Sequence, residues 1–165
     1  MAKKSKPVGS VGTPATVAAA SAGVAYTLHS YLHDRSASSY GVEAAEALGV
    51  DAGRVFKTLV VKTDNGLAVG VVPVDSTLSL KSIAAALGCK RAEMADPGSA
   101  TRATGYVLGG ISPLGQKSLL PHVVDESVLS YETVFVSAGR RGLEIELAPD
   151  DLVGLTNATL AAIAA

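Results

Sequence analysis

Two apolar runs separated by a short polar turn form the clearest pattern in the chain. Residues 54–63 and 67–74 are rich in valine and leucine, and Asp64-Asn65-Gly66 lies between them. An Asn-Gly pair between two apolar runs is the strongest short-range signal for a β-hairpin. The sequence therefore predicts two antiparallel strands joined at this turn.

Helices are predicted where a capping side chain precedes an alanine- or leucine-rich segment and a glycine follows it. A hydroxyl at the N-cap and a glycine after the last turn satisfy backbone groups that a helix leaves unpaired. Three segments carry both signals: 14–22 between Thr13 and Gly23, 42–48 between Ser38 or Ser39 and Gly49, and 80–87 between Ser79 and Gly88. Asp96-Pro97 is expected to start a helical turn, and the run from Pro149 onward to be helical in two pieces.

The other segments are expected to be short strands and loops. Strands are predicted at 24–32, 92–94, 118–120, 123–125, 133–137 and 143–147, with a turn at 138–142 and a loop at 105–115. Hairpins and helices alternate irregularly, which indicates an α+β fold rather than a doubly wound sheet. At 165 residues the chain fits a single domain. We expect a flexible N-terminal tail at 1–11 and one domain over 12–165.

The charge balance limits how the protein contacts nucleic acid. There are 14 basic and 15 acidic residues, which give a net charge of −1. Proteins that bind duplex nucleic acid through its backbone usually carry clearly more basic than acidic residues. Any contact with RNA must therefore be local, or a second protein must supply the remaining affinity.

Cysteine content and hydropathy indicate a cytoplasmic protein. The single cysteine, Cys89, excludes an internal disulfide and a thiolate metal cluster, and this fits a reducing compartment. No apolar run reaches the roughly 18 residues that a membrane-spanning helix needs. We expect neither membrane nor DNA as a partner.

Lys57 is an anomaly within the first strand of the predicted hairpin. Side chains of a strand alternate between its faces, so Lys57 shares a face with Val55, Leu59 and Val61. An ammonium group among apolar neighbours is costly unless it is paired, ligand-bound or able to reach water. Two interpretations stay open: a lysine that reaches solvent at a sheet edge, or a cation at a pocket wall that meets a phosphate or an oxyanion.

A glycine-rich loop, Gly109-Gly110-Ile111-Ser112-Pro113, is a second candidate site. Adjacent glycines allow the backbone to approach a ligand and leave N–H groups free to bind an oxyanion or a phosphate. The alternative is a tight connection that needs positive φ. The loop matches neither a dinucleotide-binding fingerprint nor a nucleophile elbow, so Ser112 is not expected to be a covalent nucleophile.

Other residues give weaker signals. Arg140 and Arg141, on a glycine-flanked turn, are candidates for RNA phosphate binding or are solvated turn residues. His29 and His33 have the i, i+4 spacing of a helical metal site, but on an extended segment they would lie about 13 Å apart. His122 has no evident metal-binding partner, and no metal or other cofactor is expected.

The motifs, taken in order, resemble the YbaK-type Cys-tRNA(Pro) deacylases, a family related to the editing insertion domain of prolyl-tRNA synthetases. The resemblance extends from about Thr13 to the C-terminus. It rests on Thr13-Pro14-Ala15, His29-Ser-Tyr31-Leu-His33-Asp34, Phe56-Lys57-Thr58-Leu59, Glu93-Met-Ala-Asp-Pro97, the run from Thr104 to Lys117, and Val136-Ser-Ala-Gly-Arg-Arg-Gly-Leu143.

The resemblance implies a central, barrel-like sheet with a pocket for the aminoacylated 3′ end of tRNA(Pro). It places the residue most closely tied to activity at Lys57. The residues it implies for substrate binding are Tyr31, Thr58, Gly109, Gly110, Ile111, Ser112, Pro113, Ser137, Gly139 and Glu144. The family pattern has an aspartate where this chain has Glu144, which keeps the charge but places the carboxylate one methylene further from the backbone.

The resemblance further implies trans-editing by substrate-assisted chemistry, in which the cysteinyl thiol attacks its own ester carbonyl. Prolyl-tRNA synthetase is the expected protein partner. The alternatives are an Ala-tRNA(Pro) deacylase, a non-catalytic module that binds aminoacyl-tRNA or the synthetase, and an unrelated metal hydrolase.

Overall fold

The computed structural model describes residues 12–32 and 40–165, so the tail expected at 1–11 and the serines expected to cap the second helix lie outside the described residues. Helix α2 (Pro14–Ala22) begins after Thr13, whose hydroxyl accepts the Thr16 amide, and ends at Gly23 with φ 72°. Both ends of this helix are as predicted.

The other predicted helices are also present. Helix α3 (Tyr40–Leu48) begins two residues earlier than predicted. Helix α4 (Leu80–Leu87) has the predicted bounds, because Ser79 caps the Ser82 amide and Gly88 adopts φ 72°. Helix α5 (Pro97–Thr104) is longer than the single turn predicted from Asp96-Pro97. Two short 3₁₀ segments, η1 (Ala52–Arg54) and η2 (Glu126–Ser130), were not predicted.

The predicted hairpin is confirmed as β2 (Phe56–Thr63) and β3 (Gly66–Pro73), which pair in antiparallel register from Phe56↔Pro73 to Thr63↔Gly66. Five further strands fall within or close to the predicted segments. They are β1 (Tyr26–Ser30), β4 (Ala92–Met94), β5 (His122–Asp125), β6 (Val134–Arg140) and β7 (Leu143–Leu147).

Three predictions are wrong in detail. Residues 118–120 form no strand, because the Lys117 and Ser118 amides donate to carbonyls at the end of α5 and hold this segment against that helix. Strand β6 continues to Arg140 through a bulge, so the turn is shorter than 138–142. Helix α6 (Pro149–Thr156) is followed by a strand, β8 (Thr159–Ala161), in place of a second helical piece.

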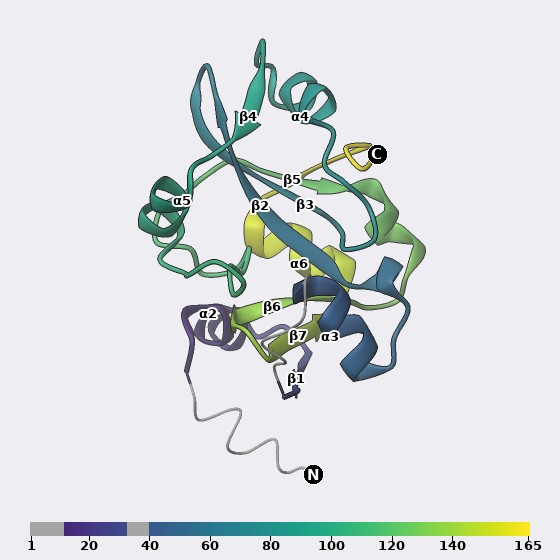
Figure 1. The fold of residues 1–165 in the computed structure, drawn as a ribbon. Helices are drawn as coiled ribbons and strands as arrows, with labels where there is room; N and C mark the ends of the chain where they lie inside the picture. Colours follow the sequence, from purple (N-terminus) through teal and green to yellow (C-terminus); the bar gives the residue numbers. More distant parts are fainter. Residues whose placement is uncertain (1–11, 33–39) are drawn as a thin grey trace.

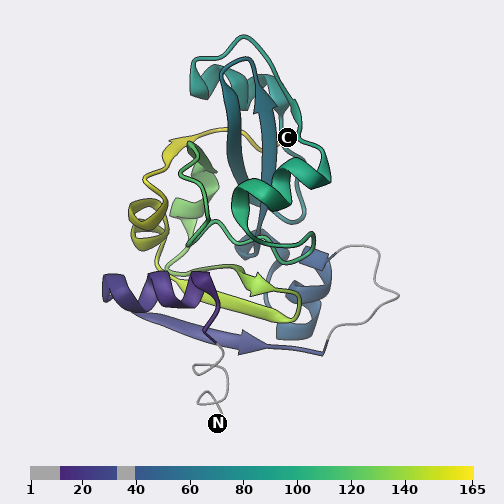
Figure 2. The same cartoon turned by 90° about the vertical axis from the view of Figure 1, so that its left-hand side faces the viewer.

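The strands form two sheets, which lie in the lower and upper parts of the molecule in Figures 1 and 2. The smaller sheet has the order β1-β7-β6, and the larger has the order β4-β2-β3-β5-β8. A parallel bridge between Val55 and Phe135 connects them. The α+β class is confirmed, but the hydrogen bonding divides the expected barrel-like sheet into these two sheets.

Apolar side chains pack on both faces of the larger sheet. Helix α4 covers one face, where Ile83 packs with Val61 and Val72. The other face shares a core with α2, α5, α6 and the smaller sheet. Helix α3 packs where the two sheets meet, against Val55 and Phe135. This junction is where the candidate site lies.

Candidate functional site

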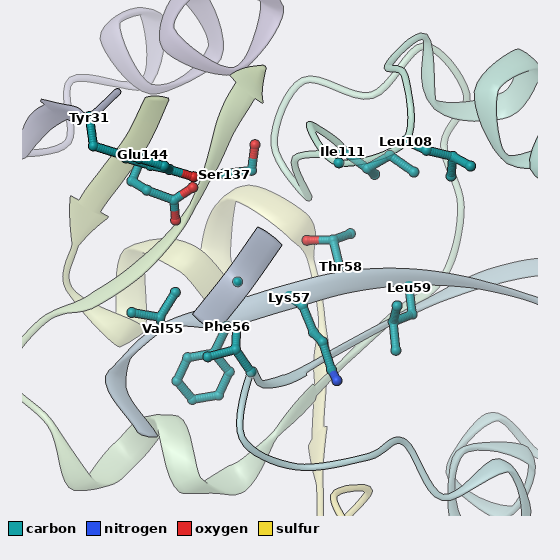
Figure 3. Close-up of a pocket in the computed structure, with 13 residues that line it drawn as sticks. Tyr31, Val55, Phe56, Lys57, Thr58, Leu59, Leu108, Ile111, Ser137 and Glu144 are labelled. Carbon is teal, nitrogen blue, oxygen red and sulfur yellow. The ribbon is translucent and has the colours of Figure 1, made fainter. Parts of the chain in front are cut away.

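A cavity of about 320 Å³ lies between the two sheets (Figure 3). Its walls come from five parts of the chain: the start of β2 with the end of β3, the strands β6 and β7, the loop after α5, the residues that follow β1, and the start of α3. The lining residues are Tyr31, Gly41, Val55, Phe56, Lys57, Thr58, Leu59, Val74, Leu108, Gly109, Ile111, Ser137 and Glu144. The volume suits a small group rather than a nucleic-acid duplex.

The cavity follows an open edge of β2. Strand β4 pairs only with Val61–Thr63, and β3 occupies the opposite edge of β2 along its whole length. Successive residues of a strand point to opposite faces, yet Lys57, Thr58 and Leu59 all line the cavity. The cavity must therefore lie beside the strand, where both faces are accessible from one space.

Lys57 lies at this edge as a half-buried cation. Figure 3 shows its side chain extending away from β2 in the direction opposite to Thr58. Within residues 12–32 and 40–165, no carboxylate forms an ion pair with its ammonium group. A cation that is partly withdrawn from water and has no protein counter-ion there is suited to an anionic ligand group.

Thr58 contributes a hydroxyl without a partner. The residue is 8% exposed, and its Oγ1 has no hydrogen bond in the described structure. Leaving a buried hydroxyl unsatisfied costs about 1–3 kcal/mol. The cavity thus holds a hydrogen-bonding group that a ligand can satisfy.

The smaller sheet supplies a buried carboxyl group. Glu144 is 6% exposed, and burial raises its pKa from 4.5 to about 8. Burial also raises the pKa of the nearby Tyr31 phenol to about 12, with the Glu144 charge acting in the same direction. These pKa values keep both groups mostly protonated at neutral pH. Ser137 lies beside them (Figure 3), and its hydroxyl accepts the Gly139 amide at 3.1 Å.

Two residues of the glycine-rich loop, Gly109 and Ile111, line the cavity and have backbone amides without a partner in the described chain. Gly109 adopts φ 87°, and both Gly109 and Ile111 line the cavity. In the described chain neither amide has a hydrogen-bond acceptor, whereas the Gly110 amide donates to the Val107 carbonyl at 3.0 Å. Two unpaired amides at a cavity wall are suited to stabilising an oxyanion.

The cavity brings together seven of the residues predicted from the sequence: Tyr31, Lys57, Thr58, Gly109, Ile111, Ser137 and Glu144. The other four do not line it. Gly110 packs against the Arg140 backbone, Gly139 packs near Thr13 and Tyr106, and the side chains of Ser112 and Pro113 are buried. The Ser112 hydroxyl accepts the Leu114 amide, so it acts within the loop.

Six lining residues were not predicted from the sequence: Gly41, Val55, Phe56, Leu59, Val74 and Leu108. Four of them are apolar residues in or next to β2 and β3, which a sequence pattern assigns to the core, and Gly41 lies in α3. Leu108 differs, because it is 52% exposed beside the glycine pair. A large apolar side chain next to that loop was a usable signal.

The weaker candidates do not join this site. His29 bonds the Glu146 carboxylate at 2.9 Å, and His33 lies outside the described residues. The described residues contain no cluster of three or more histidine, cysteine, aspartate or glutamate side chains suited to a metal. No described helix is long and apolar enough to cross a membrane.

The chain is similar to several known proteins. A family model described as "Aminoacyl-tRNA editing domain" matches residues 35–155. A protein of Enterococcus faecalis named "Putative Cys-tRNA(Pro)/Cys-tRNA(Cys) deacylase EbsC" is 44% identical over 120 residues, which are 72% of this chain and 73% of that protein. The resemblance inferred from the sequence motifs is thereby confirmed.

Two further similarities extend the comparison. A proline–tRNA ligase of Shouchella clausii is 35% identical over 100 residues, which are 61% of this chain and 18% of the ligase. The solved structure titled "Crystal structure of a putative trans-editing enzyme for prolyl tRNA synthetase" has a TM-score of 0.78 at 24% identity, covering 100% of this chain and 99% of that one. At this identity the likeness supports the fold.

Proposed function

Because the chain belongs to the aminoacyl-tRNA editing domain family, we propose that it is a trans-editing deacylase that releases the amino acid from Cys-tRNA(Pro) in the cytoplasm. Residues 12–165 form the editing domain in this proposal. The observation that carries it is one cavity lined by the Lys57 ammonium, the Thr58 hydroxyl and the loop residues Gly109 and Ile111, whose amides, like those two groups, have no partner among the described residues. The name of the 44% identical relative supports the choice of a cysteinyl substrate.

The cavity suits the end of a charged tRNA by size and by charge. It has room for an aminoacyl group and part of the terminal nucleoside, while the rest of the RNA stays outside. Lys57, on its own side of β2, meets the terminal phosphate or ribose. Glu144 faces the substrate α-ammonium, and binding of that cation lowers the pKa of the carboxyl and ionises it.

The reaction needs no protein nucleophile. The substrate thiol attacks the ester carbonyl carbon, so a C–S bond forms as the C–O bond to the ribose breaks. The thiol proton is transferred to the departing ribose oxygen, and the products are free tRNA and a cyclic thiolactone. The Gly109 and Ile111 amides stabilise the carbonyl oxygen as it becomes negative, and one such donor contributes about 3–4 kcal/mol. Holding the thiol near the ester supplies several kcal/mol more.

The likeness to a segment of proline–tRNA ligase supports a function beside that enzyme. In this proposal the chain provides, as a separate protein, an editing site for tRNA that prolyl-tRNA synthetase has charged wrongly. The synthetase then supplies affinity that the near-neutral chain lacks.

The test is deacylation of Cys-tRNA(Pro) by wild-type protein and by Lys57→Ala, with Lys62→Ala as the control. Lys62 is an exposed cation on the same strand, five residues further along it. We expect Lys57→Ala to lower kcat/KM about 100-fold or more and Lys62→Ala to change it by less than threefold. Full activity of a folded Lys57→Ala variant would refute the assigned role.

The choice of substrate separates the proposal from its alternatives. Ala-tRNA(Pro) lacks the thiol, so the proposed chemistry requires it to stay charged. Rapid release of alanine would show that a different nucleophile operates. Binding of charged tRNA without release of any amino acid would identify a non-catalytic module.

A further inference from the structure

A second hollow, of about 390 Å³, lies beside α4 and the segment that joins it to β4. Its lining residues are Leu80, Lys81, Ala84, Ala85, Cys89, Lys90, Arg91 and Ala92. We propose that this basic hollow binds backbone phosphates of the tRNA acceptor stem while the cavity at β2 holds the 3′ end. The inference rests on the proposed function, because it assigns the surface that carries the rest of the same substrate.

The hollow concentrates positive charge on a chain that is slightly acidic overall. Three of the ten lysines and arginines in the described residues line it, and no carboxylate does. Lys81 lies in the first turn of α4, where the helix dipole disfavours a cation. The helix dipole therefore does not explain a cation at this position, whereas a phosphate ligand does.

Asp64 holds one wall of the hollow in place. From the β2–β3 turn it accepts the backbone amides of Lys90 and Arg91 at 3.0 and 3.2 Å. These hydrogen bonds, with that of the Arg91 amide foremost, and the Arg91 charge hold the pKa of Asp64 below its usual value. The contact fixes the segment that presents Lys90 and Arg91.

The hollow lies on the same side of the larger sheet as Lys57. The Lys57 side chain points to the opposite face of β2 from those of Phe56 and Thr58. It therefore shares a face with Leu59 and Val61, and α4 packs on that face. Figure 1 shows α4 and β4 at the end of the β2–β3 hairpin that lies far from the smaller sheet. A strand of RNA that leaves the cavity past Lys57 therefore passes over α4.

The spacing fits the geometry of a tRNA end. Thr63 pairs with Ala92 at the hollow, and the six residues from Lys57 to Thr63 span about 20 Å of extended chain. A stacked strand rises about 3.4 Å per nucleotide, so about six nucleotides separate the two places. Beyond the unpaired end, the first base pairs of the stem reach the hollow, and their phosphates are the group that lysine and arginine bind.

The test compares a variant with Lys81, Lys90 and Arg91 all changed to glutamine with a control of equal charge. The control is Lys62→Gln, Arg102→Gln and Lys117→Gln, three exposed cations outside the hollow. Affinity for tRNA(Pro) is measured over a series of salt concentrations. Deacylation is measured on Cys-tRNA(Pro) and on a cysteinyl-CCA trinucleotide that lacks the stem, and thermal unfolding checks that both variants are folded.

We expect the hollow variant to bind tRNA(Pro) about 10- to 100-fold more weakly near 0.15 M salt. The slope of log affinity against log salt concentration should become shallower by about three, one for each lost phosphate contact. Its kcat/KM on the trinucleotide should stay within twofold of wild type, and the control should lose less than threefold on either substrate.

Equal losses in the two variants, or unchanged tRNA affinity in the hollow variant, would overturn the proposal. So would loss of binding to prolyl-tRNA synthetase with tRNA affinity intact, because the surface would then serve a protein partner. If wild-type protein binds tRNA(Pro) but releases no amino acid, the proposed function fails. The affinity and salt measurements still decide the role of the hollow in that case.

Discussion

Glu144 is a carboxyl group that water barely reaches, so its replacement by glutamine should change how stability depends on pH. Burial raises its pKa from 4.5 to about 8. Between these two values the folded protein binds a proton that the unfolded chain has released. The protonated carboxyl contributes fully to stability below pH 4.5, and this contribution is lost as the pH rises toward and through 8.

The size of the effect follows from the pKa difference. At about 1.4 kcal/mol per pKa unit, the rise corresponds to roughly 5 kcal/mol of preference for the neutral carboxyl. Most of this is lost across the neutral range, about 3–4 kcal/mol between pH 5 and pH 8. Glutamine has nearly the same shape and does not titrate. The Tyr31 phenol, with its pKa raised to about 12, stays protonated throughout this range.

The assay is urea unfolding of substrate-free wild-type and Glu144→Gln protein at several pH values from 5 to 8. We expect the difference in unfolding free energy to move in favour of the variant by about 3 kcal/mol over this range. The variant should also bind the aminoacyl end more weakly, because it cannot become a carboxylate. If the difference in unfolding free energy between variant and wild type stays constant from pH 5 to 8 to within about 0.5 kcal/mol, roughly the error of such measurements, Glu144 is not a buried, titrating group.

Three further predictions follow from single contacts. Thr58→Val removes the unsatisfied hydroxyl, so thermal unfolding should show about 1 kcal/mol of added stability while KM for Cys-tRNA(Pro) rises. Gly110→Ala places a Cβ 2.7 Å from the Arg140 Cα, so the loop must shift and kcat should fall at least tenfold. The control is Gly154→Ala, whose Cβ meets no atom within 4 Å and should change neither activity nor fold. Asp125→Asn weakens the buried carboxylate that accepts the Ser127, Ile163 and Ala164 amides. Urea unfolding at pH 7 should show that the variant loses about 2–4 kcal/mol of unfolding free energy. The difference between variant and wild type should become smaller in acid, where wild-type Asp125 is protonated, because its folded pKa lies below its usual value.

The elements whose ends are set by nearby residues were predicted correctly from the sequence. The Asn65-Gly66 turn fixes the hairpin, and Ser79 and Gly88 fix both ends of α4. Thr159–Ala161 belongs to the C-terminal run predicted to be helical, and leucine and alanine are good helix formers. In the fold these residues pair with β5, and Ala164 bridges Leu78. Such long-range pairing overrides local preference, and a single sequence does not reveal it.

The site was predictable where a residue is out of place in its own segment. Lys57 in an apolar strand and the glycine pair at 109–110 attract notice without any knowledge of the fold. Val55 and Val74 do not, because they resemble ordinary core residues. Their place at the cavity follows from the meeting of two sheets at the Val55–Phe135 bridge. The buried state of Glu144 likewise depends on that meeting.

The open edge of β2 has a consequence for solubility. Unpaired strand edges promote association between chains, and proteins commonly cover or interrupt them. Here residues 57–59 have no strand on their outer side within the described fold, and the loop that carries Leu108 and Ile111 stands over this edge. The loop thus covers the edge that a neighbouring polypeptide would otherwise pair with. Shortening this loop should expose the edge and produce oligomers, in addition to any loss of catalysis.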